Sequence, residues 1–211
     1  MNIKRYIATI ILAIVLLLNF SCTDWLDVKP VDRMSEDQLY STEAGFRQAL
    51  NGIYVELNHA DLYGDELLVN TVEILAQRYK FSSMGTLTNQ YHLAEFDYTT
   101  DYAKKCGSRI WEKAYALIAN VNKLLKNADS HKDLFTGDSY DLITGEAYAL
   151  RAFLHFDLLR LFGPVYKTHK EDKSICYNTQ FSLSGSDLLP ASKVMEYVIA
   201  DLKEAEDRLA K

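Results

Sequence analysis

Aromatic and polar side chains are interspersed along residues 79–102, and this stretch offers the chemistry of a binding site. Its rings and its polar groups are Tyr79, Phe81, Tyr91, Phe96, Tyr98 and Tyr102, with Asn89, Gln90, Asp97 and Asp101. Rings suit the apolar C–H faces of a sugar, and amides and carboxylates suit its hydroxyl rim. The candidate ligand residues are therefore Tyr79, Phe81, Asn89, Tyr91 and Tyr98. For any single ring the alternative is packing, because most aromatic side chains bury area against neighbouring elements.

The sequence contains no recognisable catalytic constellation. We find no nucleophile beside a base, no glycine loop of the phosphate-binding type and no carboxylate pair with supporting context. The histidines lack ligand spacing: His59, His92, His131, His155 and His169. Asp138 and Asp141, near Asp133, fall short of the six to eight oxygen ligands that calcium takes. We therefore expect neither an enzyme nor a bound metal or cofactor.

The spacing of apolar residues predicts the helices that position these groups. Thr42 can cap a helix whose apolar stripe ends before Asn58: Phe46, Leu50, Ile53 and Leu57. A second helix is expected from Asp65 to Arg78, with Leu68, Val72 and Leu75 turned inward. Residues 79–102 break the period and predict a long loop that has room for short strands. A loop of this length in a compact domain is more often functional than accidental.

Three further helices follow in the pattern. One covers 110–127, with Ser108 as its N-cap, and one covers 141–162, which is apolar on most sides and so buried between neighbours. Gly163 and Pro164 end it. Residues 165–189 predict a polar loop, and Pro190 opens a last helix with one apolar face: Val194, Val198, Leu202, Ala205 and Leu209. The fold class is all-α, a stack of tetratricopeptide-like helical hairpins with long loops.

Charged residues on the predicted helix 141–162 favour structure over chemistry. We expect Glu146, Arg151 and Asp157 to form buried or half-buried pairs between helices, because such pairs more often specify packing than catalysis.

The first residues indicate export. Lys4 and Arg5 precede an apolar run at 7–18, and Cys22 follows it. The run is shorter than the roughly 20 apolar residues of a membrane-spanning helix, so we interpret 1–21 as a signal peptide. Cys22 stands where a lipobox places the lipidated cysteine, which predicts a lipidated leader at 22–40. The alternatives are an uncleaved anchor, or a free or disulfide-bonded cysteine.

The composition restricts the classes of binding partner that we expect. The formal net charge is −6 and no Lys/Arg block stands out, so a nucleic-acid partner is not expected. Cys106 and Cys176 could pair in an oxidising compartment, but sequence spacing does not decide whether they meet.

The chain resembles the SusD/RagB-type nutrient-binding lipoproteins of Bacteroidetes. The motifs that carry the likeness are Ser21–Pro30, Ala49–Tyr54, Trp111–Tyr115 with Ile118–Asn120, Gly145–Ala147 with Ala149–Phe153, Leu161–Pro164, and Asp201-Leu202-x2-Ala205. The resemblance implies a SusD-like α-α superhelix at 41–211. It also implies a non-enzymatic protein, lipid-anchored on the outer face of the outer membrane and lying over a TonB-dependent SusC-type transporter. The implied ligands are glycans, less often peptides.

Members of that family are usually more than twice as long, so the chain is expected to be the N-terminal part of a larger fold, as a fragment or a truncated gene. Three functions stay open: the ligand-binding subunit of an uptake complex, a lipid-anchored helical-repeat adaptor that binds only protein, and an exported hydrolase. The loop aromatics and the resemblance favour the first.

Overall fold

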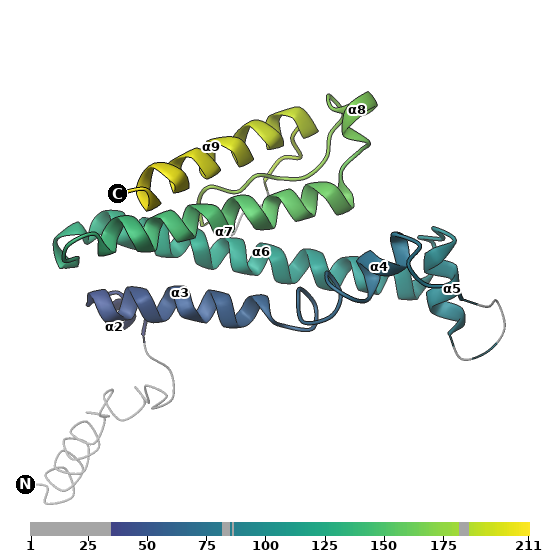
Figure 1. Cartoon of the computed structure of the whole chain (residues 1–211), viewed down its shortest axis with the longest axis horizontal. Helices are drawn as coiled ribbons and strands as arrows, with labels where there is room; N and C mark the ends of the chain where they lie inside the picture. Colours follow the sequence, from purple (N-terminus) through teal and green to yellow (C-terminus); the bar gives the residue numbers. More distant parts are fainter. Residues whose placement is uncertain (1–34, 82–84, 86, 182–185) are drawn as a thin grey trace, which may run out of the picture. The chain divides into compact units, whose positions relative to one another are not determined.

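The computed structural model describes residues 35–81, 85, 87–181 and 186–211. Long helices make up most of the fold. They are α3 (Glu43–Leu57), α6 (Asp101–Ser130), α7 (Ser139–Phe162) and α9 (Ala191–Leu209). Each runs antiparallel to the one before it (Figure 1). Short helices connect them: α2 (Glu36–Leu39), α4 (Thr71–Leu75), α5 (Thr88–Ala94), η2 (Lys132–Leu134) and α8 (Tyr166–His169). The described residues contain no strand, which confirms the predicted all-α class.

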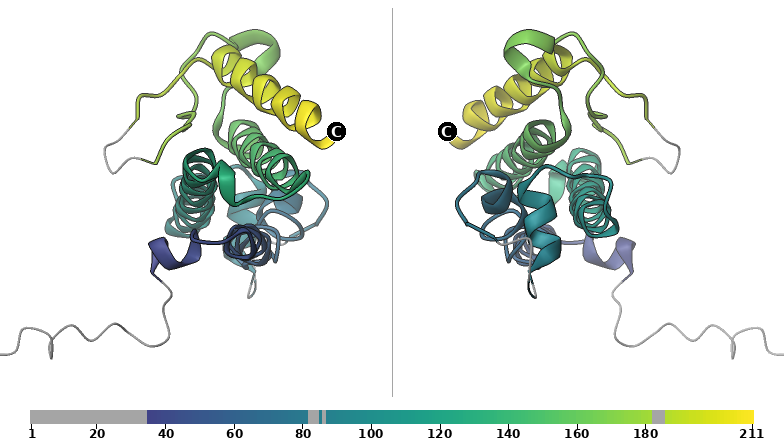
Figure 2. Two further views of the ribbon diagram at one scale, coloured as in Figure 1. Left: turned by 90° about the vertical axis from the view of Figure 1, so that its left-hand side faces the viewer. Right: turned by 90° about the vertical axis from the view of Figure 1, so that its right-hand side faces the viewer.

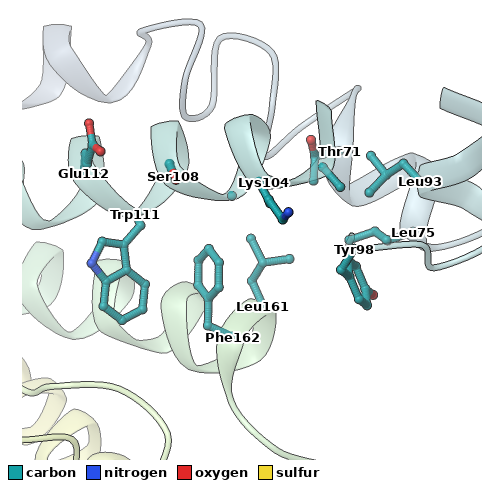
Figure 3. A pocket seen from close by; sticks show the side chains of 12 residues that line it. Thr71, Leu75, Leu93, Tyr98, Lys104, Ser108, Trp111, Glu112, Leu161 and Phe162 are labelled. Carbon is teal, nitrogen blue, oxygen red and sulfur yellow. The ribbon is translucent and has the colours of Figure 1, made fainter. Parts of the chain in front are cut away.

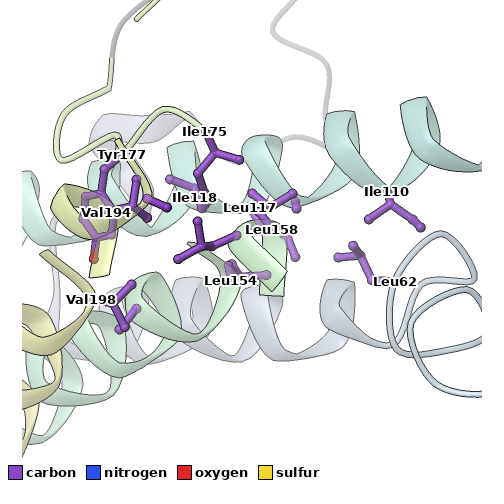
Figure 4. Packing of buried hydrophobic residues seen from close by; sticks show 14 residues of the cluster. Leu62, Ile110, Leu117, Ile118, Leu154, Leu158, Ile175, Tyr177, Val194 and Val198 are labelled. Carbon is purple, nitrogen blue, oxygen red and sulfur yellow. The ribbon is translucent and has the colours of Figure 1, made fainter. Parts of the chain in front are cut away.

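The helices are layered. α3 packs on α6 and α7, and α9 packs on the side of α7 that faces away from α3 (Figure 2). Because α7 is covered by several neighbours, it is apolar on most sides, as its sequence predicted. Figure 4 shows Leu117 and Ile118 of α6 facing Leu154 and Leu158 of α7, and all four side chains are buried.

Local sequence explains the helix ends that were predicted correctly. The Thr42 hydroxyl accepts a hydrogen bond from the Gly45 amide and so caps α3, and Asn58 closes that helix. Gly163 ends α7, and Pro190 stands at the N-cap of α9. On α9, Leu202 and Leu209 are 48% and 43% exposed. The buried part of the predicted apolar face is therefore Val194, Val198 and Ala205, while Leu209 is half-exposed but still packs beside Gly145 of α7.

The helix predicted to begin after Ser108 begins earlier. Thr100 is the N-cap of α6, and its hydroxyl accepts a hydrogen bond from the Ala103 amide. The first turns of α6 bury Ala103, Cys106 and Ile110, which share one face at i, i+3 and i+7. Small and weakly apolar residues on that face hid the helical period.

The helix predicted over 65–78 is wrong except for α4. Turns occupy 58–70, and Leu68 is 59% exposed rather than inward. The reason is a buried carboxylate: Glu66 accepts hydrogen bonds from the Thr71 hydroxyl and the Arg109 guanidinium. The chain coils around this group because a buried charge needs a partner.

The loop predicted over 79–102 contains helix α5 and the start of α6, and its described residues form no strands. Gln77 and Phe96 both adopt φ near +59°, a left-handed conformation that is uncommon for residues other than glycine. The Gln77 side chain donates to the Ala94 carbonyl at 2.6 Å and thereby ties α4 to α5. The predicted signal peptide and Cys22 lie outside the described residues.

Candidate functional site

A cavity of about 570 Å³ lies against one face of α6 (Figure 3). Its volume falls within the roughly 300–1,000 Å³ that is typical of small-molecule sites. The wall comes from α6, from the end of α7 and from the α4–α5 region: Lys104, Ser108, Trp111 and Glu112; Leu161 and Phe162; Thr71, Leu75, Leu93 and Tyr98. Residues far apart in the sequence therefore meet at one concave surface.

Helical spacing aligns the α6 side of this cavity. Lys104, Ser108 and Trp111 follow one another at intervals of four and three and so share a face. The Trp111 ring meets Phe162 edge-on, with centroids 5.1 Å apart and an interplanar angle of 86°. It also lies 4.8 Å from the Tyr115 ring. These contacts fix the orientation of the indole in the cavity wall.

The end of α7 holds Phe162 in place. The Gly163 amide donates to the Leu159 carbonyl at 2.9 Å, and a Cβ at Gly163 would lie 2.5 Å from that oxygen. A glycine at this position therefore lets the helix close directly after Phe162, and the chain then turns away from the cavity.

Two opposite charges line the cavity. Lys104 and Glu112 are exposed and are eight residues apart on α6, a rise of about 12 Å. Within the described part of the chain, neither side chain has a hydrogen-bond or ion-pair partner. Both are therefore available to a polar ligand.

A cavity of about 320 Å³ adjoins the first and shares Leu75, Tyr98 and Leu161 with it. It adds Asp157 and Arg160. The Asp157 carboxylate accepts from the Tyr63 hydroxyl at 2.7 Å and lies 3.4 Å from the Arg160 guanidinium. This pairing contributes a neutral, polar edge to the surface.

A third cavity, of about 230 Å³, shares Trp111 with the first. It lies between α6 and the segment 176–180, and its wall includes Tyr115, Asn122, Asn178 and Gln180. The buried side-chain oxygen of Asn178 has no hydrogen-bond partner among the described residues. Leaving a buried acceptor unpaired costs about 1–3 kcal/mol, which makes this atom a candidate for contact with a ligand.

A buried polar network lies behind the third cavity. Arg151 donates to Asp201 through Nε and Nη2, each at 2.7 Å, and to Asn122 Oδ1 through Nη1 at 2.9 Å. Asn122 in turn donates to the Asn178 carbonyl at 2.9 Å, and the Asn178 amide donates to His155 Nε2 at 3.0 Å. The network therefore fixes the backbone of the segment that forms one wall.

The titratable groups of this network are shifted by their burial. Desolvation lowers the pKa of His155 to about 4. Desolvation also raises the pKa of Tyr177, with a further contribution from its hydrogen bond to Asp201. The Tyr177 ring stacks on His155 at 3.9 Å. The histidine is thus neutral near pH 7 and acts as an acceptor at Nε2.

The pairs expected on α7 are confirmed as structural. Arg151 pairs with Asp201 of α9, Glu146 accepts from the Tyr54 hydroxyl of α3 at 2.7 Å, and Asp157 pairs as described above. The contacts of Arg151 and Glu146 and the Tyr63–Asp157 hydrogen bond join α7 to other parts of the chain, whereas Asp157 and Arg160 pair within α7.

The candidate ligand residues divide into two groups. Tyr98 lines two of the cavities and is 57% exposed. Phe81 packs against the cluster of Ile74, Leu93, Ala94 and Ala103. Tyr79 donates to the Val69 carbonyl at 3.1 Å, Tyr91 lies edge-on to His92, and Asn89 is exposed on α5. The structure therefore brings Tyr98 to the cavities and leaves the other four outside their walls.

Sequence reasoning missed most of the cavity wall. Trp111 and Phe162 fitted core positions of their helices, and Lys104 preceded the predicted start of α6. A usable signal was present: Lys104, Ser108, Trp111, Tyr115 and Asn122 share one helical face that mixes aromatic and polar residues.

Comparison with known proteins places the chain in a family. A SusD-like family model, described as "Starch-binding associating with outer membrane", matches residues 24–210. The chain therefore belongs to the SusD-like family. It is 27% identical over 208 residues to SusD-like protein P2 of Formosa agariphila, an alignment that covers 98% of this chain and 38% of that relative. The chain thus spans well under half the length of this relative.

Solved structures share the fold. A SusD superfamily protein from Bacteroides fragilis matches with a TM-score of 0.65 and 18% identity, over 78% of this chain and 39% of that one. A SusD-like carbohydrate binding protein from Bacteroides vulgatus also matches with a TM-score of 0.65, with 22% identity, over 79% of this chain and 35% of that one. These likenesses confirm the predicted tetratricopeptide-like helical fold.

The described residues also bear on cysteine pairing, metal ligands and membrane-spanning helices. Cys106 and Cys176 are both free thiols, so they do not pair with each other. No cluster of three or more metal-ligating side chains occurs in the part of the chain that the structure covers. Among the helices described, none is long and apolar enough to cross a bilayer.

Proposed function

We propose that this chain belongs to an outer-membrane lipoprotein that binds a nutrient at the cell surface and delivers it to a TonB-dependent SusC-type transporter. The preferred ligand is a glycan, with peptide as the second choice. Membership of the SusD-like family supports this role, and so does the description of that family as starch-binding and outer-membrane-associated.

One observation carries the proposal: the right-angled Trp111–Phe162 pair forms the wall of a 570 Å³ cavity that also presents unpaired charges. Aromatic rings provide flat apolar contact for the C–H face of a sugar. Lys104 and Glu112 provide hydrogen bonds to its hydroxyl groups. A site that combines an apolar wall with a few convergent polar groups is typical of small-ligand binding.

Tyr98 is the candidate ligand residue with the best placement, because its exposed ring stands between two cavities. Tyr79, Phe81, Asn89 and Tyr91 are proposed as contacts for a ligand that extends beyond the cavity walls toward α5. Cys22 is the proposed site of lipidation, and the acyl chains on it would hold the protein at the membrane.

Affinity electrophoresis of the full protein in gels that contain single polysaccharides tests the proposal. We expect retardation by at least one glycan. Tyr98→Ala should weaken binding roughly fivefold, because an aromatic contact contributes about 1 kcal/mol. Tyr166→Ala is the matched control, since Tyr166 is 43% exposed and lies outside the cavity walls.

The outcome separates the alternatives. Absence of retardation by every glycan, with the protein folded, would favour the lipid-anchored adaptor. If Tyr98→Ala bound glycan as tightly as the wild-type protein, the cavity would not be part of the binding site.

A further inference from the structure

The third cavity has walls of two different kinds. On one side, α6 presents Trp111, Tyr115 and Asn122. On the other side, segment 176–180 presents every second residue: Cys176, Asn178 and Gln180. Tyr177, between Cys176 and Asn178, and Ile175, directly before this segment, are buried in the core. This alternation is that of an extended chain, so the cavity is lined by one face of an extended segment.

The aromatic side of this cavity is rigid. The Tyr115 hydroxyl donates to the Cys176 carbonyl at 2.8 Å, and its ring packs against Trp111. Trp111 is in turn held by Phe162. Fixed rings lose little conformational freedom when a ligand packs on them.

The polar side is rigid in its backbone and unsatisfied in its side chains. The Asn178 amide and carbonyl groups are bonded to His155 and Asn122. The side-chain amides of Asn178 and Gln180 have no hydrogen-bond partner within the described ranges. Rotation about the last torsion of an asparagine is broad and roughly two-fold, so Asn178 can offer either its oxygen or its nitrogen to the cavity.

The size and charge of the cavity define what fits it. Its volume of about 230 Å³ is below the roughly 300 Å³ at which complete drug-sized sites begin. The cavity therefore holds one ring-sized unit rather than a whole ligand. Among the residues that the structure describes, no Asp, Glu, Lys, Arg or His lines it, in contrast to the first cavity with Lys104 and Glu112. The two unbonded amides, of Asn178 and Gln180, and the two rings match an uncharged ring that carries hydroxyl groups.

The third cavity continues the first. Trp111 lines both, and the α6 residues from Lys104 to Asn122 follow one helical face over a rise of about 27 Å. A ligand that occupies both cavities must be elongated and must pass Trp111.

We propose that the cavity between α6 and segment 176–180 is a second subsite for one neutral, hydroxylated sugar ring of a linear oligosaccharide whose neighbouring units occupy the first cavity. Trp111 separates the two subsites, and Asn178 and Gln180 hydrogen-bond the hydroxyl groups of the ring. This inference rests on the proposed glycan-binding function and adds the form of the ligand and the residues at its end.

Calorimetry on the full protein tests the subsite, with two linear series as probes: maltose to maltoheptaose and cellobiose to cellohexaose. We expect affinity to rise with chain length in at least one series. Asn178→Ala should abolish the gain from the longer chains and leave the affinity for the shortest binding member within twofold. Asn120→Ala is the matched control, because Asn120 is an exposed asparagine on α6 outside the cavities.

Thermal denaturation separates a binding role from a structural one. The Asn178 side chain makes no hydrogen bond within the described residues, so Asn178→Ala should keep or slightly raise the melting temperature. A clear fall in melting temperature would assign the side chain to the fold and overturn the subsite. Equal length dependence in Asn178→Ala and wild type would also overturn it, while the glycan-binding function would stand. Absence of wild-type binding to both series would overturn the subsite, and the polysaccharide gels would then decide the function separately.

Discussion

Arg151 on α7 and Asp201 on α9 form a bidentate ion pair, with both nitrogen–oxygen distances at 2.7 Å and both side chains buried. The remaining Arg151 nitrogen donates to Asn122 on α6. One guanidinium therefore joins three helices and, through Asn122, the wall of the proposed second subsite. Bidentate pairing between a guanidinium and a carboxylate fixes geometry as well as charge.

Removal of the carboxylate charge should destabilise the protein strongly. We expect Asp201→Asn to lower the free energy of unfolding by about 3–5 kcal/mol, because Arg151 would remain as a buried cation without a counter-charge. Urea denaturation followed by circular dichroism measures this. Glu196→Gln is the control: Glu196 pairs with Lys193 at the surface, and its loss should have no measurable effect. Equal midpoints for Asp201→Asn and wild type would contradict the prediction.

Stability should fall in mild acid because of His155. Its folded pKa is about 4, and its ordinary value is 6.5. Between these values the unfolded state binds more protons, so stability is complete above pH 6.5 and is lost as the pH falls toward 4. The neighbouring charges are Arg151, which opposes protonation, and Asp201, which favours it. The loss attributable to this group is about 3 kcal/mol.

Unfolding free energies measured at intervals from pH 7 to pH 4 test this dependence. His155→Gln should flatten the curve in that window, although it should lower stability throughout. Glu43 titrates separately: hydrogen bonds from Ser139 and Thr136 lower its pKa to about 2, so its contribution is lost only below pH 4.5. A slope between pH 6.5 and 4.5 that persists in His155→Gln would assign the effect to another group.

Two glycines on α3 should respond oppositely to alanine. A Cβ at Gly45 would overlap the backbone carbonyl of Leu39, so Gly45→Ala should displace α2 and destabilise the protein by about 1–3 kcal/mol. A Cβ at Gly52 would meet nothing within 4 Å, so Gly52→Ala should stabilise it by up to about 1 kcal/mol. Melting temperatures of the two variants measure the contrast, and shifts of the same sign would refute it.

Lipidation at Cys22 should be visible chemically. Cells grown with an alkyne-tagged fatty acid should label the wild-type protein and the Cys176→Ser variant, but not Cys22→Ala. Cys176 is the suitable control because it is a free thiol on the folded part of the chain. Labelling of Cys22→Ala at the wild-type level would rule out the proposed anchor site.

The sequence predicted the long helices well because their burial follows the helical period. The apolar stripe of α3, the apolar length of α7 and the helix ends at Thr42 and Gly163 depend on nearby residues alone. The region between α3 and α6 depends instead on a distant contact. Glu66 is neutralised by Arg109, more than forty residues away, and no local pattern encodes that pairing.

The candidate site was predictable in its chemistry and only partly in its residues. Tyr98 was one of five candidates taken from a stretch that mixes rings with polar groups, and only Tyr98 lines the cavities. Trp111 and Phe162 were assigned to packing, and they do pack, but on each other at the edge of a cavity. Nothing in the sequence pointed to Asn178. It matters because its buried side-chain oxygen has no hydrogen-bond partner among the described residues, and a sequence pattern does not show this.

Backbone hydrogen bonds join the two ends of the connection between α7 and α9. The Ser174 amide donates to the Leu189 carbonyl at 2.8 Å, and the Leu189 amide donates to the Ile175 carbonyl at 3.0 Å. These hydrogen bonds therefore hold residues 174–175 and residue 189 together. Insertions and deletions in homologous genes can accumulate between them without altering the helical frame, since each doubling of a loop's length costs only about 0.6 kcal/mol. Because Tyr177 and the Asn178 backbone are bonded to the helices, alignments of distant homologues should place their gaps between positions 181 and 188 rather than in segment 176–180 or inside α7 or α9.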